Sequence, residues 1–520
     1  DALTTGSQNT FVGFNAGGAA TDRSYNTAIG DSALATNVNG ARNVAIGNAS
    51  LSNMNPASDV DTYNVAIGYD AGLSVTTGVE NTIIGGLAGD ALTTGNYNIS
   101  IGHTALSTED TGSKNVAIGH QSLLNLNYDG DGHNTAVGHN SGASITTARY
   151  NTILGSLAGD ALTTGAENVA IGYGALGQED GNGKNVAVGM NALTTQNAGA
   201  EGYNVAVGWD VGKSITTGIQ NTIIGAAAGD ALTTGANNVA VGYLALSAED
   251  GHGKNVAVGS FALQDLNAGA DGGNVAVGYV AGAELTTGIR NVIIGSWAGD
   301  ALTTGDHNIA VGSFALSNED GHGKNIAIGY NALEDLNAGA DAYNVAIGHN
   351  AGKDVTTGVT NTLVGGLAGD VLTTGSYNTV LGYTALGTED TGTRNVAIGY
   401  AALNKLNYNG SGNNVAIGME AAKEVTTGIQ NTIIGSFAAK SGTNDLTTGN
   451  NNIILGYNAA ASAADVQNEI TLGNSSIAAL RCQVTSISSL SDKRDKKDIK
   501  DSTYGLDFVD SLKPVTFEWD

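Results

Sequence analysis

The hydrophobic residues of this chain alternate with small residues in short segments that recur from one end to the other. Each segment begins with Asn and is followed by Gly, as in Asn-Val-Ala-Ile-Gly at 43–47. In an extended segment, Val44 and Ile46 point to one side and Ala45 to the other. Gly at this density disfavours helix, because it costs about 1 kcal/mol at each interior helical position. The pattern predicts a five-residue β-strand in each copy.

The segment occurs in 27 copies, whose Asn residues run from Asn9 to Asn452 and Asn468. After Asn81 the steps are seventeen, seventeen, nineteen and seventeen positions, to Asn98, Asn115, Asn134 and Asn151. The same steps then repeat, so that four coils make a seventy-residue block. A fixed short period is typical of a solenoid, and strands this close leave no room for a crossover helix. We predict an all-β fold for residues 1–475, a parallel β-solenoid of about 27 short coils that is on the order of 130 Å long.

The middle residue of the strand suggests how the coils are covered. It is Ala in most copies and Ile in every fourth, at Ile83, Ile153, Ile223, Ile293 and Ile433. A coil that closes within so few positions encloses little core. We therefore expect neighbouring chains to pack against the Ala side, which makes an oligomer. The alternative is a monomeric solenoid whose Ala side faces water.

The recurrent Asn and Gly have structural roles in this interpretation. Stacked Asn side chains can hydrogen-bond from coil to coil and cap the turn. The Gly after each strand supplies a positive φ or a close approach at a corner. We expect a structural ladder rather than a ligand site, represented by Asn43, Asn115, Asn185, Asn255, Asn325 and Asn395.

The strings NVAIGY, NVAIGH and NVAVGY, followed by Ala-Leu or Ala-Gly, resemble the head repeats of YadA-like trimeric autotransporter adhesins over about residues 9–475. The resemblance implies a left-handed parallel β-roll in which three identical chains wind side by side. The opening Asp-Ala-Leu-Thr-Thr-Gly repeats the string at 90–95. We therefore expect the chain to start inside a repeat, with a natural N-terminal anchor before it.

Composition narrows the function classes. The 520 residues contain 77 Gly and only 2 Pro, which excludes collagen, and the net charge is −27. An acidic chain without a basic patch is a poor partner for nucleic acid or anionic membranes. The single Cys482 excludes a disulfide framework and any Cys-based zinc site. No apolar run approaches the length of a membrane span, so we expect no membrane insertion.

The composition changes after about residue 475, where the Asn and Gly pattern stops. We read residues 476–490 as a linker and 491–520 as the first part of another domain. Ser491, Asp492, Arg494, Lys496 and Ile499 match one for one the pattern that opens the endosialidase-type intramolecular chaperone of phage tail spikes and fibres. Phe517 and Trp519 fit a later strand of that family. Since the family domain is usually longer, we expect the chain to be cut inside it.

The resemblance implies a domain that trimerises, assists folding of the fibre and then cuts itself off. The scissile bond would be Leu490–Ser491, with Ser491 as nucleophile and Lys496 as general base. Lys serves as a base only if burial lowers its pKa. Asp492 and Arg494 would hold the geometry. The alternative for this segment is a charged, solvated linker to a coiled coil.

Five loops carry acids at equivalent places: 107–110, 177–180, 247–250, 317–320 and 387–390. They could bind Ca²⁺ in a column, but we expect solvated turns. The loop that begins at 125 has Ala136 where a calcium loop needs Glu. The eight His show no ligand spacing, and no carboxylate pair for glycoside hydrolysis is recognisable. We expect no metal, no cofactor and no substrate-directed enzyme activity.

The sequence therefore predicts a structural, homotrimeric fibre of the phage tail-fibre kind that attaches to a host or other surface. A C-terminal chaperone would assemble it and release itself. The expected partners are two further copies of the chain and an unidentified cell-surface receptor, and the expected location is a virion or a cell surface. Two alternatives stay open: the shaft of a bacterial trimeric adhesin, and an ice-binding solenoid suggested by the Thr-Thr-Gly strings such as 163–165.

Overall fold

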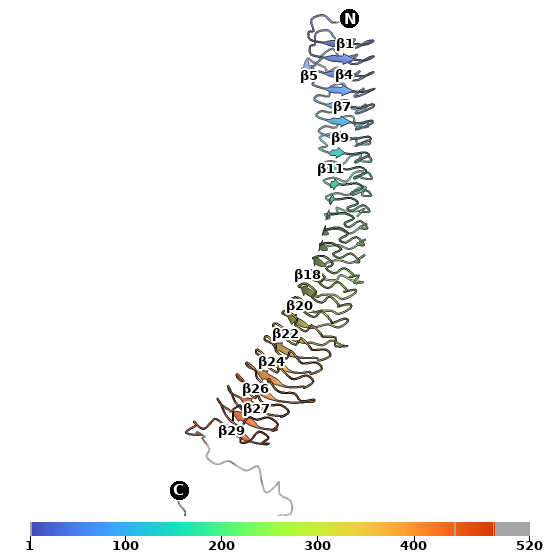
Figure 1. Cartoon of the computed structure of the whole chain (residues 1–520). Coiled ribbons are helices and arrows are strands. Elements are labelled where there is room, and N and C mark those ends of the chain that lie inside the picture. The colour runs from blue at the N-terminus through green and yellow to red at the C-terminus, as the bar shows by residue number, and fades with distance from the viewer. Residues whose placement is uncertain (1–2, 441, 443, 482, 484–520) are drawn as a thin grey trace, which may run out of the picture. The chain divides into compact units, whose positions relative to one another are not determined.

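The computed structural model describes residues 3–440, 442, 444–481 and 483. The chain divides into two compact units, residues 1–473 and residues 474–520. The first unit is a column of stacked coils, each contributing one short strand to a common sheet (Figure 1). No α-helix occurs among the described residues. The predicted all-β parallel solenoid of about 27 coils is confirmed.

The main sheet has 27 strands, and each pairs in parallel with the strand of the next coil. The register advances by whole coils, as where Val186, Ala187 and Val188 pair with Val205, Ala206 and Val207. The strands are β1 (Thr10–Val12), β2 (Thr27–Ile29), β4 (Val44–Ile46), β6 (Val65–Ile67), β7 (Thr82–Ile84), β8 (Ile99–Ile101), β9 (Val116–Ile118), β10 (Thr135–Val137), β11 (Thr152–Leu154), β12 (Val169–Ile171), β13 (Val186–Val188), β14 (Val205–Val207), β15 (Thr222–Ile224), β16 (Val239–Val241), β17 (Val256–Val258), β18 (Val275–Val277), β19 (Val292–Ile294), β20 (Ile309–Val311), β21 (Ile326–Ile328), β22 (Val345–Ile347), β23 (Thr362–Val364), β24 (Thr379–Leu381), β25 (Val396–Ile398), β26 (Val415–Ile417), β27 (Thr432–Ile434), β28 (Ile453–Leu455) and β29 (Ile470–Leu472). A small second sheet pairs β3 (Gly40–Ala41) with β5 (Val60–Asp61).

These strands have three residues instead of the five expected, because the flanking residues turn the chain. The Gly that follows each strand has a positive φ, for example 136° at Gly259. A Cβ at Gly259 would lie 2.2 Å from the carbonyl oxygen of Gly278 in the next coil. Glycine is therefore required here for both its backbone conformation and the close approach of two coils.

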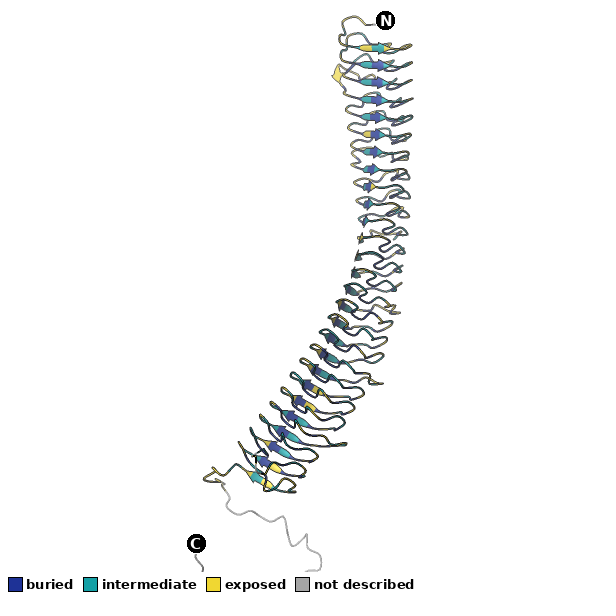
Figure 2. Cartoon of the chain, in the orientation of Figure 1, coloured by how far each residue is buried: buried dark blue, intermediate teal, exposed yellow. Residues whose placement is uncertain are grey.

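The core lies inside each chain, on the Ala side of the strands. The middle residue of nearly every strand is fully buried, while its two neighbours are half-exposed or exposed, as Figure 2 shows along the column. Ala187 packs in one cluster with Ala192 and Leu193, which lie in the turn segment after the strand. Our expectation that other chains cover the Ala side is wrong, because the turn segments of the same chain already cover it.

The turn side of the column has no strands but is equally regular. Its backbone groups bond from coil to coil, as where the N–H of Leu176 donates to the carbonyl of Ala192 at 2.9 Å. Buried leucines with positive φ recur there, including Leu106, Leu176 and Leu246. The coil-to-coil bonds satisfy the backbone of these left-handed turns, which would otherwise be costly for residues other than Gly.

The last coil differs from the sequence prediction. We assigned Asn468 to the recurrent Asn position, but the residue at that position is Glu469, whose N–H donates to Asn452 Oδ1 at 2.9 Å. Asn468 lies one residue earlier, at a corner with a φ of 59°. The last copy therefore follows the strand pattern without the Asn.

Candidate functional site

The residues predicted to perform self-cleavage, Ser491, Asp492, Arg494 and Lys496, lie outside the described residues, as does Leu490. Their roles stay predictions. The described part of the chain offers three other features with functional meaning: the Asn ladder, an apolar outer face and a set of buried glutamates.

The Asn ladder is present, and the side chains of most of its members bond to two groups of the next coil. At Asn291 the side-chain Oδ1 accepts the N–H of Asn308 in the next coil at 2.8 Å. Its Nδ2 donates to the carbonyl of Gly305, at the corner of that coil, at 2.8 Å. Asn291 is fully buried. Each stacked amide of this kind thus bonds both the N–H that precedes the next strand and the carbonyl at the corner of that coil. This is a structural role.

The six Asn residues named from the sequence keep only part of this pattern. All six are fully buried, and each Oδ1 accepts the N–H of the next ladder Asn, at distances such as 3.1 Å from Asn204 to Asn185. The coil that follows each of the six is longer than the seventeen-residue coils, so the corner carbonyl is displaced. The Nδ2 groups of Asn185 and Asn255 have no hydrogen-bond partner among the described residues, and that of Asn325 bonds within its own coil. The six are Asn43, Asn115, Asn185, Asn255, Asn325 and Asn395.

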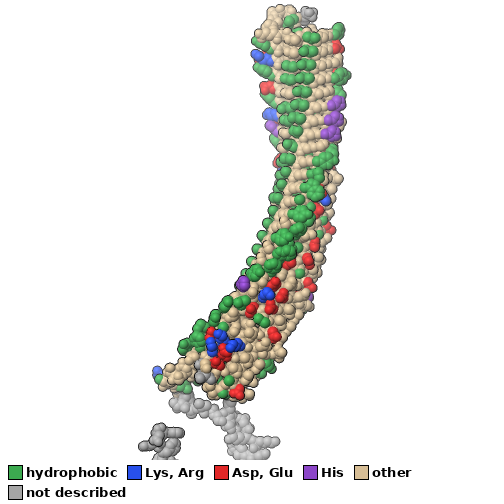
Figure 3. Space-filling view, in the orientation of Figure 1, with side chains coloured by type: hydrophobic (Ala, Val, Ile, Leu, Met, Phe, Trp, Pro, Cys, Tyr) green, Lys and Arg blue, Asp and Glu red, His purple; other side chains and the backbone are tan. Residues whose placement is uncertain are grey.

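The outer face of the strands carries apolar side chains that the chain itself does not cover. Val207, Val277 and Ile347, at equivalent places in successive seventy-residue blocks, have 36 to 38% of their surface exposed. Figure 3 shows hydrophobic side chains gathered in a stripe along the length of the column. Three residues span about 10 Å and 27 strands about 130 Å, so the strand face as a whole, including the Thr that begins strands such as β2 and β11, covers on the order of 1,300 Å². Monomers rarely expose apolar patches above about 600 Å².

Aromatic side chains extend this stripe. Tyr243, Phe261, Tyr279 and Trp297 form a continuous row, in which successive rings meet edge to face at centroid distances of 5.4, 6.0 and 5.6 Å. Tyr243 and Tyr279 directly follow the Gly that ends a strand, and about half of each is exposed. The row therefore borders the strand face and adds to its apolar area.

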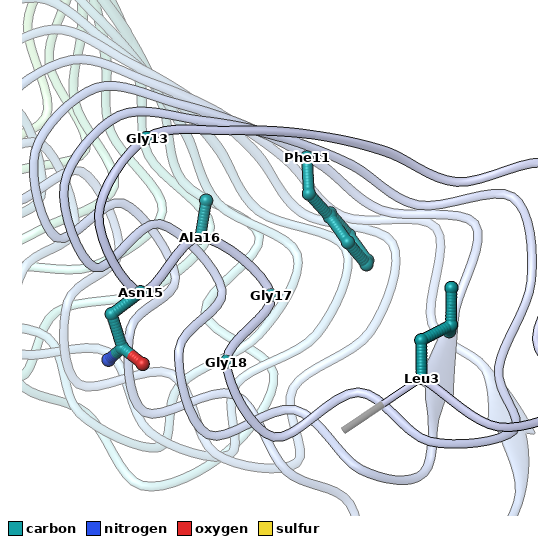
Figure 4. Close-up of a pocket in the computed structure, with 7 residues that line it drawn as sticks. All are labelled: Leu3, Phe11, Gly13, Asn15, Ala16, Gly17 and Gly18. Carbon is teal, nitrogen blue, oxygen red and sulfur yellow. The ribbon is translucent and has the colours of Figure 1, made fainter. Parts of the chain in front are cut away.

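A hollow of about 310 Å³ lies at the first coil. Phe11, the middle residue of β1, points into it together with Leu3, and Ala16 and Gly17 line its other side (Figure 4). The hollow lies on the inner face of the first coil. In every later coil, the preceding coil covers the equivalent face. The hollow therefore continues the core rather than forming a separate ligand site.

The acidic loops differ from the solvated turns that we expected. The Glu of each loop is fully buried, and one oxygen accepts a backbone N–H from further along the same loop, as from Gly112 to Glu109 at 2.7 Å. Burial raises the pKa of Glu109, Glu319 and Glu389, and it raises the pKa of Glu179 to about 7. Each buried glutamate therefore stabilises its own loop by accepting a backbone N–H from the interior side. The equivalent residues are Glu109, Glu179, Glu249, Glu319 and Glu389.

In the Thr-Thr-Gly strings the hydroxyl of the first Thr bonds to the following coil. Thr163 Oγ1 donates to the carbonyl of Asp180 at 2.6 Å, and Thr233 and Thr303 make the same bond to the following coil. Hydroxyls engaged in this way link coils. This geometry gives no support to the ice-binding alternative.

A family model matches the C-terminal segment of the chain. The family model described as chaperone of endosialidase matches residues 491–520, which is the segment that the sequence pattern singled out. No curated protein matches the chain. The described residues contain no helix long and apolar enough to be a membrane span. A long β-solenoid together with this chaperone segment fits a phage tail fibre-like structural protein.

Proposed function

We propose that the chain forms the shaft of a homotrimeric, tail fibre-like structure that carries an attachment function, and that its C-terminal segment releases itself after assembly. The observation that carries the proposal is the chaperone-family match at 491–520 in the same chain as a solenoid of 27 stacked strands. A chaperone that aligns chains answers a physical need, because near-identical coils could otherwise pair out of register. The fibre would act at the surface of a virion or cell.

The apolar outer face supports assembly from copies of the chain. A strand face of on the order of 1,300 Å² exceeds the roughly 800 Å² that each partner buries in a standard protein interface. The stripe runs along the whole column, as an interface between parallel, equally long partners requires. Three copies placed around one axis would cover each other's stripes.

Assembly can be tested with three lysines on the strand face. Sedimentation of the wild-type chain should give a trimer, and the variant V207K/V277K/I347K should be a folded monomer, because each lysine would bring charge into the interface. The matched control A200K/A270K/A340K places the same charge on exposed loop positions of the same blocks and should remain trimeric. A wild-type chain that sediments as a folded monomer would refute the assembly.

The proposed cleavage is an acyl shift followed by hydrolysis. Lys496 would take the proton of Ser491 Oγ, which attacks the carbonyl carbon of Leu490. The peptide C–N bond breaks as the ester forms, and the nitrogen takes up the proton to become the amine of Ser491. Water then hydrolyses the ester and leaves a carboxylate on Leu490.

Cleavage can be tested by expressing the chain in its natural full-length context and separating the products on a denaturing gel. The wild type should give a fragment that ends at Leu490, which mass spectrometry identifies. The variants S491A and K496A should stay uncut, whereas K497A, at a position outside the family pattern, should be cut normally. An uncut wild type, or an S491A variant that is cut like the wild type, would contradict the proposal.

A further inference from the structure

Two of the five buried-glutamate loops contain a histidine that the others lack. Residues 249–252 and 319–322 both read Glu-Asp-Gly-His, whereas residues 179–182 read Glu-Asp-Gly-Asn. The remaining two loops, at 109–112 and 389–392, read Glu-Asp-Thr-Gly. The chain thus holds the same turn with and without an imidazole, at equivalent places in successive seventy-residue blocks.

The backbone of both His-containing loops is held on two sides. Glu249 Oε1 accepts the N–H of His252 at 2.9 Å, and Glu319 Oε1 accepts that of His322 at 3.1 Å. The carbonyl of each His accepts the Nδ2 of a ladder Asn in the preceding coil, at 3.2 Å from Asn238 to His252. The backbone of each His is therefore held beside the buried carboxylate before any ligand arrives.

The donor atoms lie at the spacing of ligands around one small ion. Nδ1 of the His is 3.5 Å from Glu249 Oε1 in the first loop and 3.3 Å from Glu319 Oε1 in the second. With bonds of about 2.0–2.2 Å, two ligands of a tetrahedral zinc ion are about 3.4 Å apart. The exposed Asp of each loop completes a group whose atoms lie within 4.8 Å of one another. Being exposed, that Asp can turn toward an ion.

Unpartnered buried atoms occur in both groups. His252 Nδ1 is buried and has no hydrogen-bond partner among the described residues. Glu319 Oε2 is also buried without such a partner, whereas its counterpart Glu249 Oε2 accepts the N–H of Ala268 at 3.3 Å. The lysine two residues after each His does not pair with these carboxylates. Lys254 pairs with Asp271 of the next coil at 2.7 Å, and Lys324 pairs with Asp341. Each group therefore holds two carboxylates that neither lysine neutralises.

We propose that each Glu-Asp-Gly-His loop binds one divalent transition-metal ion of the zinc class. The ligands are Glu249, Asp250 and His252 in the first loop and Glu319, Asp320 and His322 in the second. Imidazole with carboxylates suits zinc rather than calcium, which takes oxygen ligands only. Water would complete the coordination. The ion ties the exposed Asp to the buried Glu, so the two sites brace the column four coils apart, independently of how many chains assemble.

The test is calorimetric titration of the full, metal-free chain with Zn²⁺. The wild type should bind two more ions than the variant H252N/H322N, which restores the Glu-Asp-Gly-Asn sequence that the chain itself accommodates at 179–182. This variant keeps the other six histidines and therefore measures background binding. H252N alone should lose one ion. Ca²⁺ should give no heat that depends on His252 or His322.

A gain-of-function variant checks the geometry directly. Asn182 stands where the two Glu-Asp-Gly-His loops have His, and its N–H donates to Glu179 Oε1 at 3.1 Å, as in those loops. The variant N182H should therefore bind a third Zn²⁺, and Co²⁺ should show matching ligand-field absorption bands. Equal zinc binding by the wild type and H252N/H322N would overturn the proposal and leave simple His–Glu ion pairs. So would an N182H variant that folds but gains no ion.

Discussion

Removing one amide from the Asn ladder tests how the coils are held together. Asn291→Ala deletes the acceptor for the N–H of Asn308 and the donor to the carbonyl of Gly305, both at 2.8 Å. Asn255→Ala, two coils earlier, is the matched comparison. Asn255 Oδ1 also accepts a backbone N–H, from Asn274 at 3.2 Å, but its Nδ2 has no partner among the described residues.

The expected costs follow from the groups left unpaired. An unsatisfied buried donor or acceptor costs about 1–3 kcal/mol. Asn291→Ala leaves two such groups, so the loss is about 2–6 kcal/mol. Asn255→Ala leaves one, and it also removes an amide that was already unpaired. Both variants delete the same side-chain volume, so the difference of about 1 kcal/mol or more reports the bond to the corner carbonyl.

Hydrogen exchange measured by mass spectrometry is the suitable assay, because an array of coils can open locally. Peptides around 291–308 in the Asn291→Ala variant should lose protection by a factor of about 30 or more, since about 1.4 kcal/mol corresponds to a factor of ten. That loss should exceed the loss around 255–274 in the Asn255→Ala variant by about fivefold or more. Equal losses, or a larger loss for Asn255→Ala, would refute the assignment of the second bond.

Two further predictions concern the corners and the buried glutamates. Gly259→Ala should unfold the adjoining coils, because its Cβ would lie 2.2 Å from the carbonyl oxygen of Gly278. Gly199→Ala, whose Cβ would have nothing within 4 Å, should cost only the left-handed backbone strain of about 1–2 kcal/mol. Similar hydrogen-exchange protection in the two variants would contradict this prediction. Burial raises the pKa of Glu179 to about 7, so the folded state keeps its proton while the unfolded state ionises from about pH 4.5, and this residue's contribution to stability falls as the pH rises from about 4.5 to 7. Glu179→Gln should therefore gain melting temperature relative to the wild type across that range, and a difference that does not change with pH would count against the raised pKa.

The repeat could be predicted from the sequence because its residue types have strong local conformational preferences. The period-two segments, the Asn spacing and the Gly corners led directly to the parallel coils. The side that faces the core could not be predicted in the same way. Ala187 and its neighbours Val186 and Val188 are all apolar, and only the turn residues Ala192 and Leu193, packed behind Ala187, decide which side is inside.

The candidate sites were predicted less completely, for a similar reason. The ladder was visible as a column of Asn, but which amides complete their second bond depends on coil length, as at Asn185 and Asn255. Neighbouring acids in a loop indicate a solvated turn, because charged side chains are rarely buried, yet Glu249 is fully buried. The Glu-Asp-Gly-His string at 249–252 was the available signal, and a search for closely spaced histidine pairs misses it.

Glu469, which occupies the Asn position in the last coil, makes the end of the column at β29 a poor acceptor for a further strand. Glu469 uses its carboxylate within its own coil, where Oε1 accepts the N–H of Ser462 at 3.0 Å and the hydroxyl of Thr471 at 2.8 Å. An incoming strand would meet no amide oxygen there to receive its first N–H. Lengthwise addition of a second column beyond β29 is thereby discouraged, much as charged residues protect the edges of other sheets from unwanted polymerisation.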